Sequence, residues 1–287
     1  MGLRVGRGRV GGCASVVLFA CCSSGLAAEE FVYPLKPAAG PNGAVYVADL
    51  KLPGISVVKN GHIEKYFTAT KKIGSPLSHV RCVAVDRDGK VLAGDSATRE
   101  VYRFDQPGNP TPLTKGAQAG IGIPMAIVVD SKKNILVADL EVHTIWKIPP
   151  QGGAPERFAQ IPAPCGMAID DQDRLWVVSR SRRQLFRVSS DGRVEVAVAD
   201  RPFQFPNDVA LDGHGTVYIS DGYAKSIWKL TEGTKPQSWI SGGPLVNPVG
   251  LAWQEGGLLI ADPNPQSKTG HVYKADASGT LSPLVGK

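Results

Sequence analysis

The chain has 287 residues, enough for one large all-β domain or two ordinary ones, and its composition is that of a globular protein. Its formal net charge is +6, but Arg4, Arg7 and Arg9 all stand in the first nine residues. Without that basic start the charge falls to about +3, so the composition does not indicate a nucleic-acid partner.

The first 28 residues have the pattern of an export signal. A basic start with no acid before Glu29 is followed by an apolar run over residues 16–22 and then by small residues. The run is shorter than the roughly 20 residues that span a bilayer. We therefore predict a cleaved signal peptide over residues 1–28, export to the periplasm or the cell exterior, and no transmembrane span. Alternatively, residues 18–21 resemble a bacterial lipoprotein box, in which Cys21 would carry a lipid anchor.

A sixteen-residue pattern recurs along the rest of the chain: an apolar strand, a tight turn, and a second apolar strand that usually ends in Asp. Its copies span residues 34–49, 80–95, 124–139, 164–179, 206–221 and, with one deletion, 248–262. Each is followed by a third strand with an apolar, aromatic, basic signature and by a more polar fourth strand. Four strands per repeat make one propeller blade. The sequence therefore predicts a single all-β domain over residues 29–287, a six-bladed β-propeller with four antiparallel strands per blade.

Two cysteines, Cys82 and Cys165, lie in this domain, and the other three precede it. Both are predicted on inner strands of blades that are not neighbours, where a disulfide between them would be hard to close. We expect them to be buried as small hydrophobic residues.

The repeat opens on Pro, any residue, Gly, Val, Ala, Val, Asp and closes on Val, Ala, Asp, as in residues 164–170 and 137–139. This pattern resembles the NHL-repeat propellers and the wider group that contains the gluconolactonase (SMP-30-like) enzymes. NHL repeats usually carry Asn, His, Arg shortly after the closing Asp. Here other residues fill the Arg position, so the chain is NHL-like rather than a consensus member: Glu100, Thr144, Gln184 and Ser226.

The resemblance to gluconolactonases implies a divalent cation such as Ca²⁺ in the central channel, held by a first-blade Glu and by Asn and Asp of later blades. The repeat alignment names the residue pairs that open the inner strands toward the channel: Leu35 and Lys36, Arg81 and Cys82, Met125 and Ala126, Cys165 and Gly166, Asn207 and Asp208, Val249 and Gly250. Only Asn207 and Asp208 could supply oxygen ligands. The first-blade Glu is missing, and Lys36 with Arg81 would repel a cation. We therefore predict no resident cofactor.

The start of each inner strand and the loop after each second strand are expected on one face of the propeller. The candidate ligand-binding residues on that face are Asn207, Asp208, Arg81, Lys36, Asp49, Asp95, Asp139, Asp221, Asp262, His143 and Arg183. For the five repeated aspartates the alternative is structural, because Asp at a strand end readily accepts hydrogen bonds from nearby backbone amides. Asn207 and Asp208 break the apolar pattern of the repeat and are the most informative pair. No catalytic residue is assigned.

A short basic run, Arg180, Arg182 and Arg183, follows the second strand of the fourth repeat, where Ser179 replaces the usual Asp. It could receive an anionic ligand, or it could be a solvated loop. The chain has no Gly-rich phosphate loop, no CxxC and no Gly-x-Ser-x-Gly element, which removes several enzyme classes.

These observations predict a binding propeller that acts outside the cytoplasm and presents a site for a small molecule, a glycan or an envelope protein at the mouth of its channel. The alternative is a gluconolactonase-like hydrolase or lyase with a degenerate metal site. A third hypothesis is a lipoprotein subunit that serves as a docking platform in an envelope assembly. Fold alone does not decide among the three.

Overall fold

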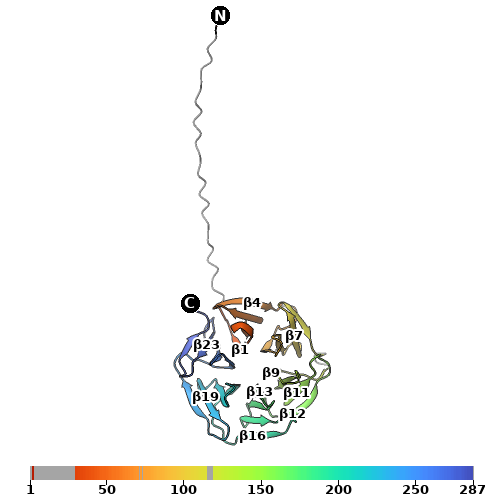
Figure 1. Cartoon of the computed structure of the whole chain (residues 1–287), viewed down its shortest axis with the longest axis vertical. Coiled ribbons are helices and arrows are strands. Elements are labelled where there is room, and N and C mark those ends of the chain that lie inside the picture. Colours follow the sequence, from red (N-terminus) through yellow and green to blue (C-terminus); the bar gives the residue numbers. More distant parts are fainter. Residues whose placement is uncertain (1, 3–29, 71, 73, 115–118, 287) are drawn as a thin grey trace.

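The computed structural model describes residues 2, 30–70, 72, 74–114 and 119–286. Apart from residue 2, the predicted signal peptide, including Cys21, lies outside the described residues. The described chain forms six sheets of four antiparallel strands, placed in a ring around a central axis (Figure 1). The predicted six-bladed β-propeller is therefore confirmed.

Each blade is one meander of four consecutive strands. The innermost strands are β1 (Pro34–Ala39), β5 (Val80–Val85), β9 (Pro124–Val129), β13 (Pro164–Ile169), β17 (Pro206–Leu211) and β21 (Gly250–Gln254). The second strands are β2 (Val45–Asp49), β6 (Val91–Asp95), β10 (Ile135–Asp139), β14 (Leu175–Ser179), β18 (Thr216–Asp221) and β22 (Gly257–Asp262). The third strands are β3 (Gly54–Lys59), β7 (Glu100–Gln106), β11 (Thr144–Ile148), β15 (Leu185–Val188), β19 (Ser226–Thr231) and β23 (His271–Ala275). The outer strands are β4 (His62–Thr68), β8 (Asn109–Pro112), β12 (Glu156–Gln160), β16 (Val194–Val198), β20 (Gln237–Ser241) and β24 (Leu281–Pro283).

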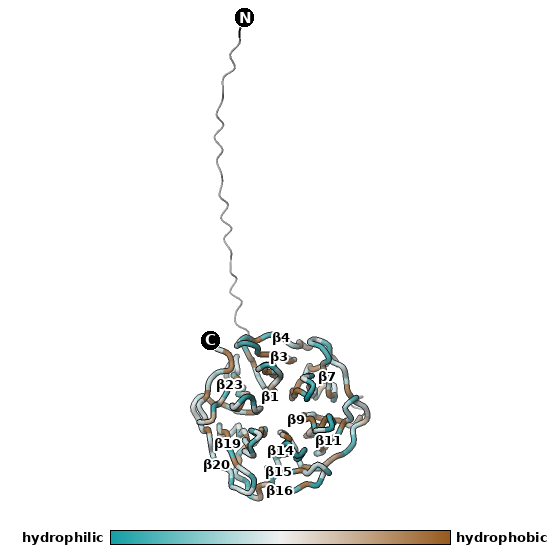
Figure 2. Tube along the Cα trace, in the orientation of Figure 1, coloured by the Kyte–Doolittle hydropathy of each residue, from teal (hydrophilic) through white to brown (hydrophobic). Residues whose placement is uncertain are grey.

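Burial follows from this layout. Every residue of β2, β6, β10, β14 and β22 is buried, because both faces of a second strand pack against neighbouring blades. The outer strands are mostly exposed and polar, as β4 and β12 show. Figure 2 accordingly shows apolar segments within the blades and hydrophilic ones mainly in the connecting turns. The hydrophobic core is thus divided among the interfaces between blades.

The aromatic residues of the third strands lie in these interfaces, as predicted. Tyr102, Trp146 and Phe186 are each at most 6% exposed. Phe186 of the fourth blade shares a cluster with Leu136 and Ile145 of the third. Packing of this kind is the usual role of buried aromatic side chains, and it holds neighbouring blades together.

The inner strands carry a shared irregularity at their second residue. Pro206 pairs with Asp221 and Asp208 pairs with Ser220, so Asn207 is an extra residue in the ladder. The same bulge falls on Leu35, Arg81, Met125 and Cys165 in the other blades that begin this way. A bulge turns a side chain away from the alternating pattern. Here it places consecutive side chains at the head of each inner strand beside the channel.

The ring closes without exchange of a strand between its ends, because β1–β4 and β21–β24 are each complete sheets. Phe31, Val45 and Leu259 belong to one hydrophobic cluster at this junction. Hydrogen bonds that cross it include those from Gly270 N to Phe31 O (3.0 Å), from Gln254 Nε2 to Ala44 O (3.2 Å) and from Lys36 Nζ to Leu251 O (2.7 Å). Side chains and a few backbone contacts therefore join the first blade to the sixth.

Among the described residues, no helix has the length and apolar character that a membrane crossing needs. Cys82 on β5 and Cys165 on β13 are free and buried, which confirms their predicted burial.

Candidate functional site

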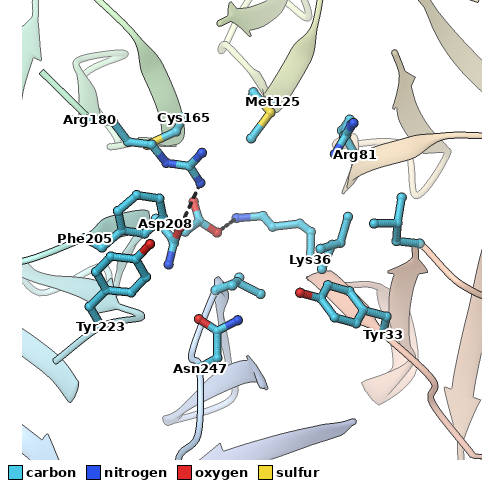
Figure 3. A pocket seen from close by; sticks show the side chains of 15 residues that line it. Tyr33, Lys36, Arg81, Met125, Cys165, Arg180, Phe205, Asp208, Tyr223 and Asn247 are labelled. Atoms are coloured by element: carbon cyan, nitrogen blue, oxygen red, sulfur yellow. Dashed lines mark hydrogen bonds and ion pairs between the residues drawn. The ribbon is translucent and has the colours of Figure 1, made fainter. Parts of the chain in front are cut away.

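A cavity of about 330 Å³ opens at the end of the channel where the inner strands begin (Figure 3). Its volume is at the lower end of the range usual for small-molecule sites. Its lining comes from all six inner strands and from loops at the same face. The lining residues are Tyr33, Leu35, Lys36, Leu50, Arg81, Met125, Cys165, Arg180, Phe205, Asn207, Asp208, Tyr223, Asn247, Val249 and Gly250.

The expected gathering of Asn207, Asp208, Arg81 and Lys36 at one channel mouth is found, since all four line this cavity. The repeat register is therefore correct. The bulged residue of every inner strand that carries the bulge is among the lining residues, which explains how a sequence repeat becomes a ring of side chains around one space.

Lys36 and Asp208 form a buried ion pair across the channel, between the first blade and the fifth. The Lys36 ammonium also donates to Leu251 O (2.7 Å), and Asp208 accepts from Leu251 N (2.8 Å) and Val209 N (2.9 Å). The Lys36 side chain is 13% exposed and that of Asp208 is 6% exposed. Burial raises the pKa of Asp208 above its usual value, while the Lys36 ammonium opposes that rise. The pair joins three blades at the floor of the cavity.

A second group of contacts lies beside this pair. The Arg180 guanidinium donates through Nη2 to Asn207 Oδ1 (2.8 Å), and Asn207 Nδ2 donates to Pro248 O (3.2 Å). The guanidinium lies over the Phe205 ring, 4.6 Å from its centroid, and Phe205 stacks on Tyr223 at 4.5 Å. Arg180, Phe205 and Tyr223 form a layered stack at the rim of the cavity (Figure 3). One end of this stack is cationic and the other is aromatic.

Arg81 lies on the other side of Met125 from Arg180 in the same view (Figure 3). Its Nε donates to Ser96 Oγ (2.9 Å). Cys165 lines the cavity, but burial raises the pKa of its thiol to about 12 against the opposing effect of Arg180. A thiol with this pKa is not a nucleophile at neutral pH.

The five repeated aspartates do not line the cavity. Each accepts backbone hydrogen bonds from the loop that enters its own blade, as Asp49 does from Val32 N (2.8 Å) and Tyr33 N (2.9 Å). Most also accept a hydrogen bond from the turn that follows the second strand, as Asp139 does from Glu141 N (3.0 Å). The corresponding bonds recur at Asp95, Asp221 and Asp262. These carboxylates hold the loops at the site face in place.

The loop residues singled out with them also lie outside the cavity lining. The residue before the third strand is in the left-handed region at Arg99, His143 and Lys225, with φ of 55°, 57° and 50°. His143 accepts from Ala163 N through Nδ1 (2.7 Å), and Arg99 pairs with Glu141. Arg183 is exposed. The structure gives these residues turn and surface contacts.

The side-chain oxygen atoms that line the cavity do not fit the divalent cation that the gluconolactonase resemblance implies. Asp208 is the cavity's carboxylate and already binds the Lys36 ammonium, while the amide oxygen of Asn207 accepts from Arg180. Ca²⁺ takes six to eight oxygen ligands. In the part of the chain that the structure describes, no three His, Cys, Asp or Glu residues lie together in a way that would hold a metal.

Two glycines allow the inner strands to approach closely beneath the site. A Cβ on Gly166 would lie 2.4 Å from the Asp208 Cα, and one on Gly250 would lie 2.2 Å from Leu35 O. Both contacts are shorter than packed atoms tolerate, and both involve backbone that cannot move away cheaply. Glycine at these repeat positions therefore sets the spacing between blades at the cavity floor.

The sequence analysis missed several lining residues, and a signal for them exists. Tyr33, Phe205 and Asn247 occupy the same repeat position, immediately before the first residue of the sixteen-residue pattern. Leu50 and Arg180 both follow the last residue of a second strand. Reading these two flanking positions in every repeat, in addition to the strand openings, would have found Tyr33, Leu50, Phe205 and Asn247. Arg180 had been named only as part of a basic run that could receive an anionic ligand, and Tyr223 lies at neither position.

Comparisons with solved structures place this fold among known propellers. Virginiamycin B lyase from Staphylococcus aureus is 14% identical, with a TM-score of 0.66 over 89% of this chain and 85% of that chain. A gluconolactonase from Xanthomonas campestris is 16% identical, with a TM-score of 0.68 over 82% and 84%. The PQQ-bound aldose sugar dehydrogenase from Streptomyces coelicolor is 13% identical, with a TM-score of 0.66 over 86% and 95%.

No family model and no curated protein matches the sequence. At identities this low, structural similarity establishes the fold and not the activity. The structural neighbours are propeller enzymes by name. The chain thus has the six-bladed β-propeller fold that the sequence predicted, and this fold is similar to those of a gluconolactonase and a virginiamycin B lyase.

Proposed function

We propose that this protein is a hydrolase or lyase that acts on a small molecule in the channel-mouth cavity without a resident metal ion. The observation that carries the proposal is the buried Lys36–Asp208 pair at the floor of an open cavity. A buried carboxylate with a shifted pKa and a specific charged partner in a cleft is a candidate functional group. The named activities of the structural neighbours support an enzyme over a passive scaffold.

The cavity residues suit the cleavage of a carbon–oxygen bond beside a carbonyl group. Such reactions place negative charge on an oxygen, and fixed cationic donors in a site shielded from water stabilise that charge strongly. Lys36 and Arg180 are such donors. In this proposal the Lys36 ammonium fills the electrostatic role that a cation would otherwise have.

In this proposal Lys36 and Asp208 also transfer the protons. In hydrolysis, Asp208 would take a proton from the attacking water while Lys36 stabilises the oxyanion. As the oxyanion collapses, the carbon–oxygen bond breaks and the protonated Asp208 returns its proton to the departing oxygen. In an elimination, Asp208 would remove the proton next to the carbonyl and Lys36 would protonate the departing oxygen. The Cys165 thiol takes no part, because its pKa is raised to about 12.

A binding propeller is the second candidate, and the completeness of the ion pair favours it. Asp208 accepts from Lys36 and from two backbone amides, so its oxygens are already well satisfied. A pair held this firmly could simply form the floor of a binding site for a small molecule, a glycan or an envelope protein. Either candidate acts outside the cytoplasm in our proposal, on the basis of the basic and apolar pattern of residues 1–28.

Turnover measurements test the proposal. The purified protein is incubated with δ-gluconolactone, a homoserine lactone and 4-nitrophenyl acetate, and release of acid or of nitrophenol is followed. We expect turnover of at least one substrate, loss of about 100-fold or more in Asp208→Asn, and no change in Asp276→Asn, an exposed carboxylate in another turn. Equal turnover by the wild type and Asp208→Asn would place the reaction elsewhere, and no turnover would favour the binding propeller.

A further inference from the structure

The charges that line the channel-mouth cavity do not balance. Lys36, Arg81 and Arg180 are cationic, and Asp208 is the lining carboxylate. Lys36 pairs with Asp208, which leaves the two arginines in excess. Among the described residues, neither Arg81 nor Arg180 has an Asp or Glu oxygen within ion-pair distance. A concave site with excess charge of one sign concentrates ligands of the other sign.

Arg180 is held so that part of its guanidinium remains available. Its Nη2 is bound to Asn207 and its plane rests on Phe205. Its Nε is buried and has no hydrogen-bond partner among the described residues. A ligand in the cavity cannot reach a donor this deeply buried, so its acceptor would have to bind the other terminal nitrogen, Nη1, since Nη2 is bound to Asn207. The bond to Asn207 and the packing on Phe205 therefore hold the guanidinium in one orientation at the cavity.

Arg81 offers a second donor in the same cavity. It is half-buried, its side chain is fixed by the bond from Nε to Ser96 Oγ, and it stands on the other side of Met125 from Arg180 (Figure 3). Guanidinium groups bind carboxylates more specifically than ammonium groups do, because their planar fork matches the two oxygens. Two guanidinium groups at the same channel mouth indicate a ligand that carries a carboxylate.

The rim beside Arg180 is aromatic. Tyr223 is 70% exposed although it is stacked flat on Phe205, with an angle of 18° between the rings. A large exposed aromatic that is already fixed in orientation offers a flat surface to a ligand ring at low entropic cost. The rim therefore complements the guanidinium groups with a platform for a ring.

We propose that the channel-mouth cavity recognises a small ring-bearing organic carboxylate, with its carboxylate on Arg180 and Arg81 and its ring against Tyr223. The cavity of about 330 Å³ admits one ring with its substituents. The inference deepens the proposed function and rests on the same cavity being the working site. It identifies the preferred substrate of the enzyme, or the preferred ligand of the binding protein, as an acid, and a substrate without a carboxylate is expected to bind more weakly.

The test is a binding measurement that needs no turnover. Isothermal titration and the melting temperature are recorded with D-glucuronate, benzoate, D-glucose and sulfate at fixed ionic strength. We expect at least one of the two carboxylates to bind and raise the melting temperature. D-glucose, which has the ring of glucuronate without the carboxylate, should not bind. Sulfate should bind more weakly than the carboxylate that binds, because it has no ring.

Two variants and one control locate the site. Arg180→Gln and Arg81→Gln should each weaken carboxylate binding by about 10- to 100-fold, the loss expected for a charge-assisted contact. Arg182→Gln removes the same charge from an exposed position two residues away, outside the cavity lining, and should bind as the wild type does. Arg81 does not contact Asn207 or Phe205, so its variant remains informative if Arg180→Gln folds poorly.

The proposal is overturned if neither carboxylate binds with a Kd below about 10 mM, if D-glucose binds as well as glucuronate, or if both cavity variants keep wild-type affinity. Equal binding of sulfate would overturn the ring contact. These outcomes are independent of the activity test, because a protein that binds carboxylates without turning over any substrate fails only the proposed chemistry.

Discussion

Two sets of acidic residues lie at the same face of the propeller and have different structural roles. The repeated aspartates, such as Asp139, bind backbone amides within their own blade, in a pattern that recurs around the ring. Asp208 occurs once and binds across blades, to Lys36 of the first and Leu251 of the sixth. Repeated contacts within a blade belong to the architecture, whereas a contact that joins different blades at the axis belongs to the site.

The largest expected effect comes from breaking the contact between blades. Lys36→Met removes the cation and leaves the Asp208 carboxylate buried without a counter-ion. We expect a loss of about 3–5 kcal/mol in the free energy of unfolding, as for other buried pairs that lose one partner. Urea denaturation of the wild type and the variant measures it.

The double variant Lys36→Met with Asp208→Asn supplies the control. It removes the charge that the single variant leaves unpaired, so it should recover much of the lost stability. If the double variant is as unstable as the sum of the two single variants, Lys36 and Asp208 are not energetically coupled, and the distinction between the two sets of acids loses its basis.

A smaller loss in the free energy of unfolding is expected when a repeated aspartate is removed within a blade. Asp139→Ala removes the acceptor for Gly122 N (2.7 Å), Ile123 N (3.0 Å) and Trp146 Nε1 (2.9 Å). The loss should be about 2–3 kcal/mol, because donors at the rim regain only part of their bonds from water. Thermal or urea unfolding measures this loss.

Asp139→Ser is the matched variant, because the fourth blade already carries Ser179 at this position. Ser179 accepts from Ser181 N (3.0 Å) and donates to Pro162 O. A serine should therefore cost less than an alanine. Carboxylate binding at the channel mouth should be unchanged in both variants, and a large loss of binding would give the repeated aspartates a direct role in the site.

The smallest expected effect is a dependence of folding stability on pH. Burial raises the pKa of Asp208 in the folded protein above the value of about 3.9 in the unfolded chain. The folded state then holds more protons than the unfolded state between these two values, so this residue makes stability fall as pH rises through that window. Without Lys36 the pKa of Asp208 rises further, because its counter-ion is gone.

The stability gap between wild type and Lys36→Met should therefore narrow by about 1–2 kcal/mol as pH falls from 7 toward 4, since each unit of pKa difference corresponds to about 1.4 kcal/mol. Denaturation curves at several pH values measure this gap. A gap that is constant with pH would mean that the variant is destabilised by lost packing and not by the unpaired charge.

The fold and part of the site were predictable from the sequence for one reason. The repeat places Arg81, Cys165 and Asn207 at one register, and the shared bulge carries that register into the cavity. Burial of Cys82 and of the third-strand aromatics followed from the same alignment. Residues at the same position of the sequence repeat therefore occupy the same position in each blade.

What the sequence could not give is the pairing across the axis. Lys36 and Asp208 are 172 residues apart and meet because the ring closes. The sequence analysis named Lys36 as a candidate ligand-binding residue and as a charge that repels a metal, but not as the partner of Asp208. The layered stack of Arg180, Phe205 and Tyr223 likewise joins loops of the fourth and fifth blades. Such contacts depend on how loops from separate repeats face one another, which no single repeat encodes.

The way the ring closes has a consequence for how the chain can be rearranged. Every blade is built from one uninterrupted segment, so no strand is borrowed across the junction of the first and last blades. The C-terminal end lies beside the first blade (Figure 1). A chain joined there and opened instead in the short loop between β12 and β13 would keep all six sheets whole. In this propeller the order of the blades around the axis is a property of the fold, while the place where the chain starts is arbitrary.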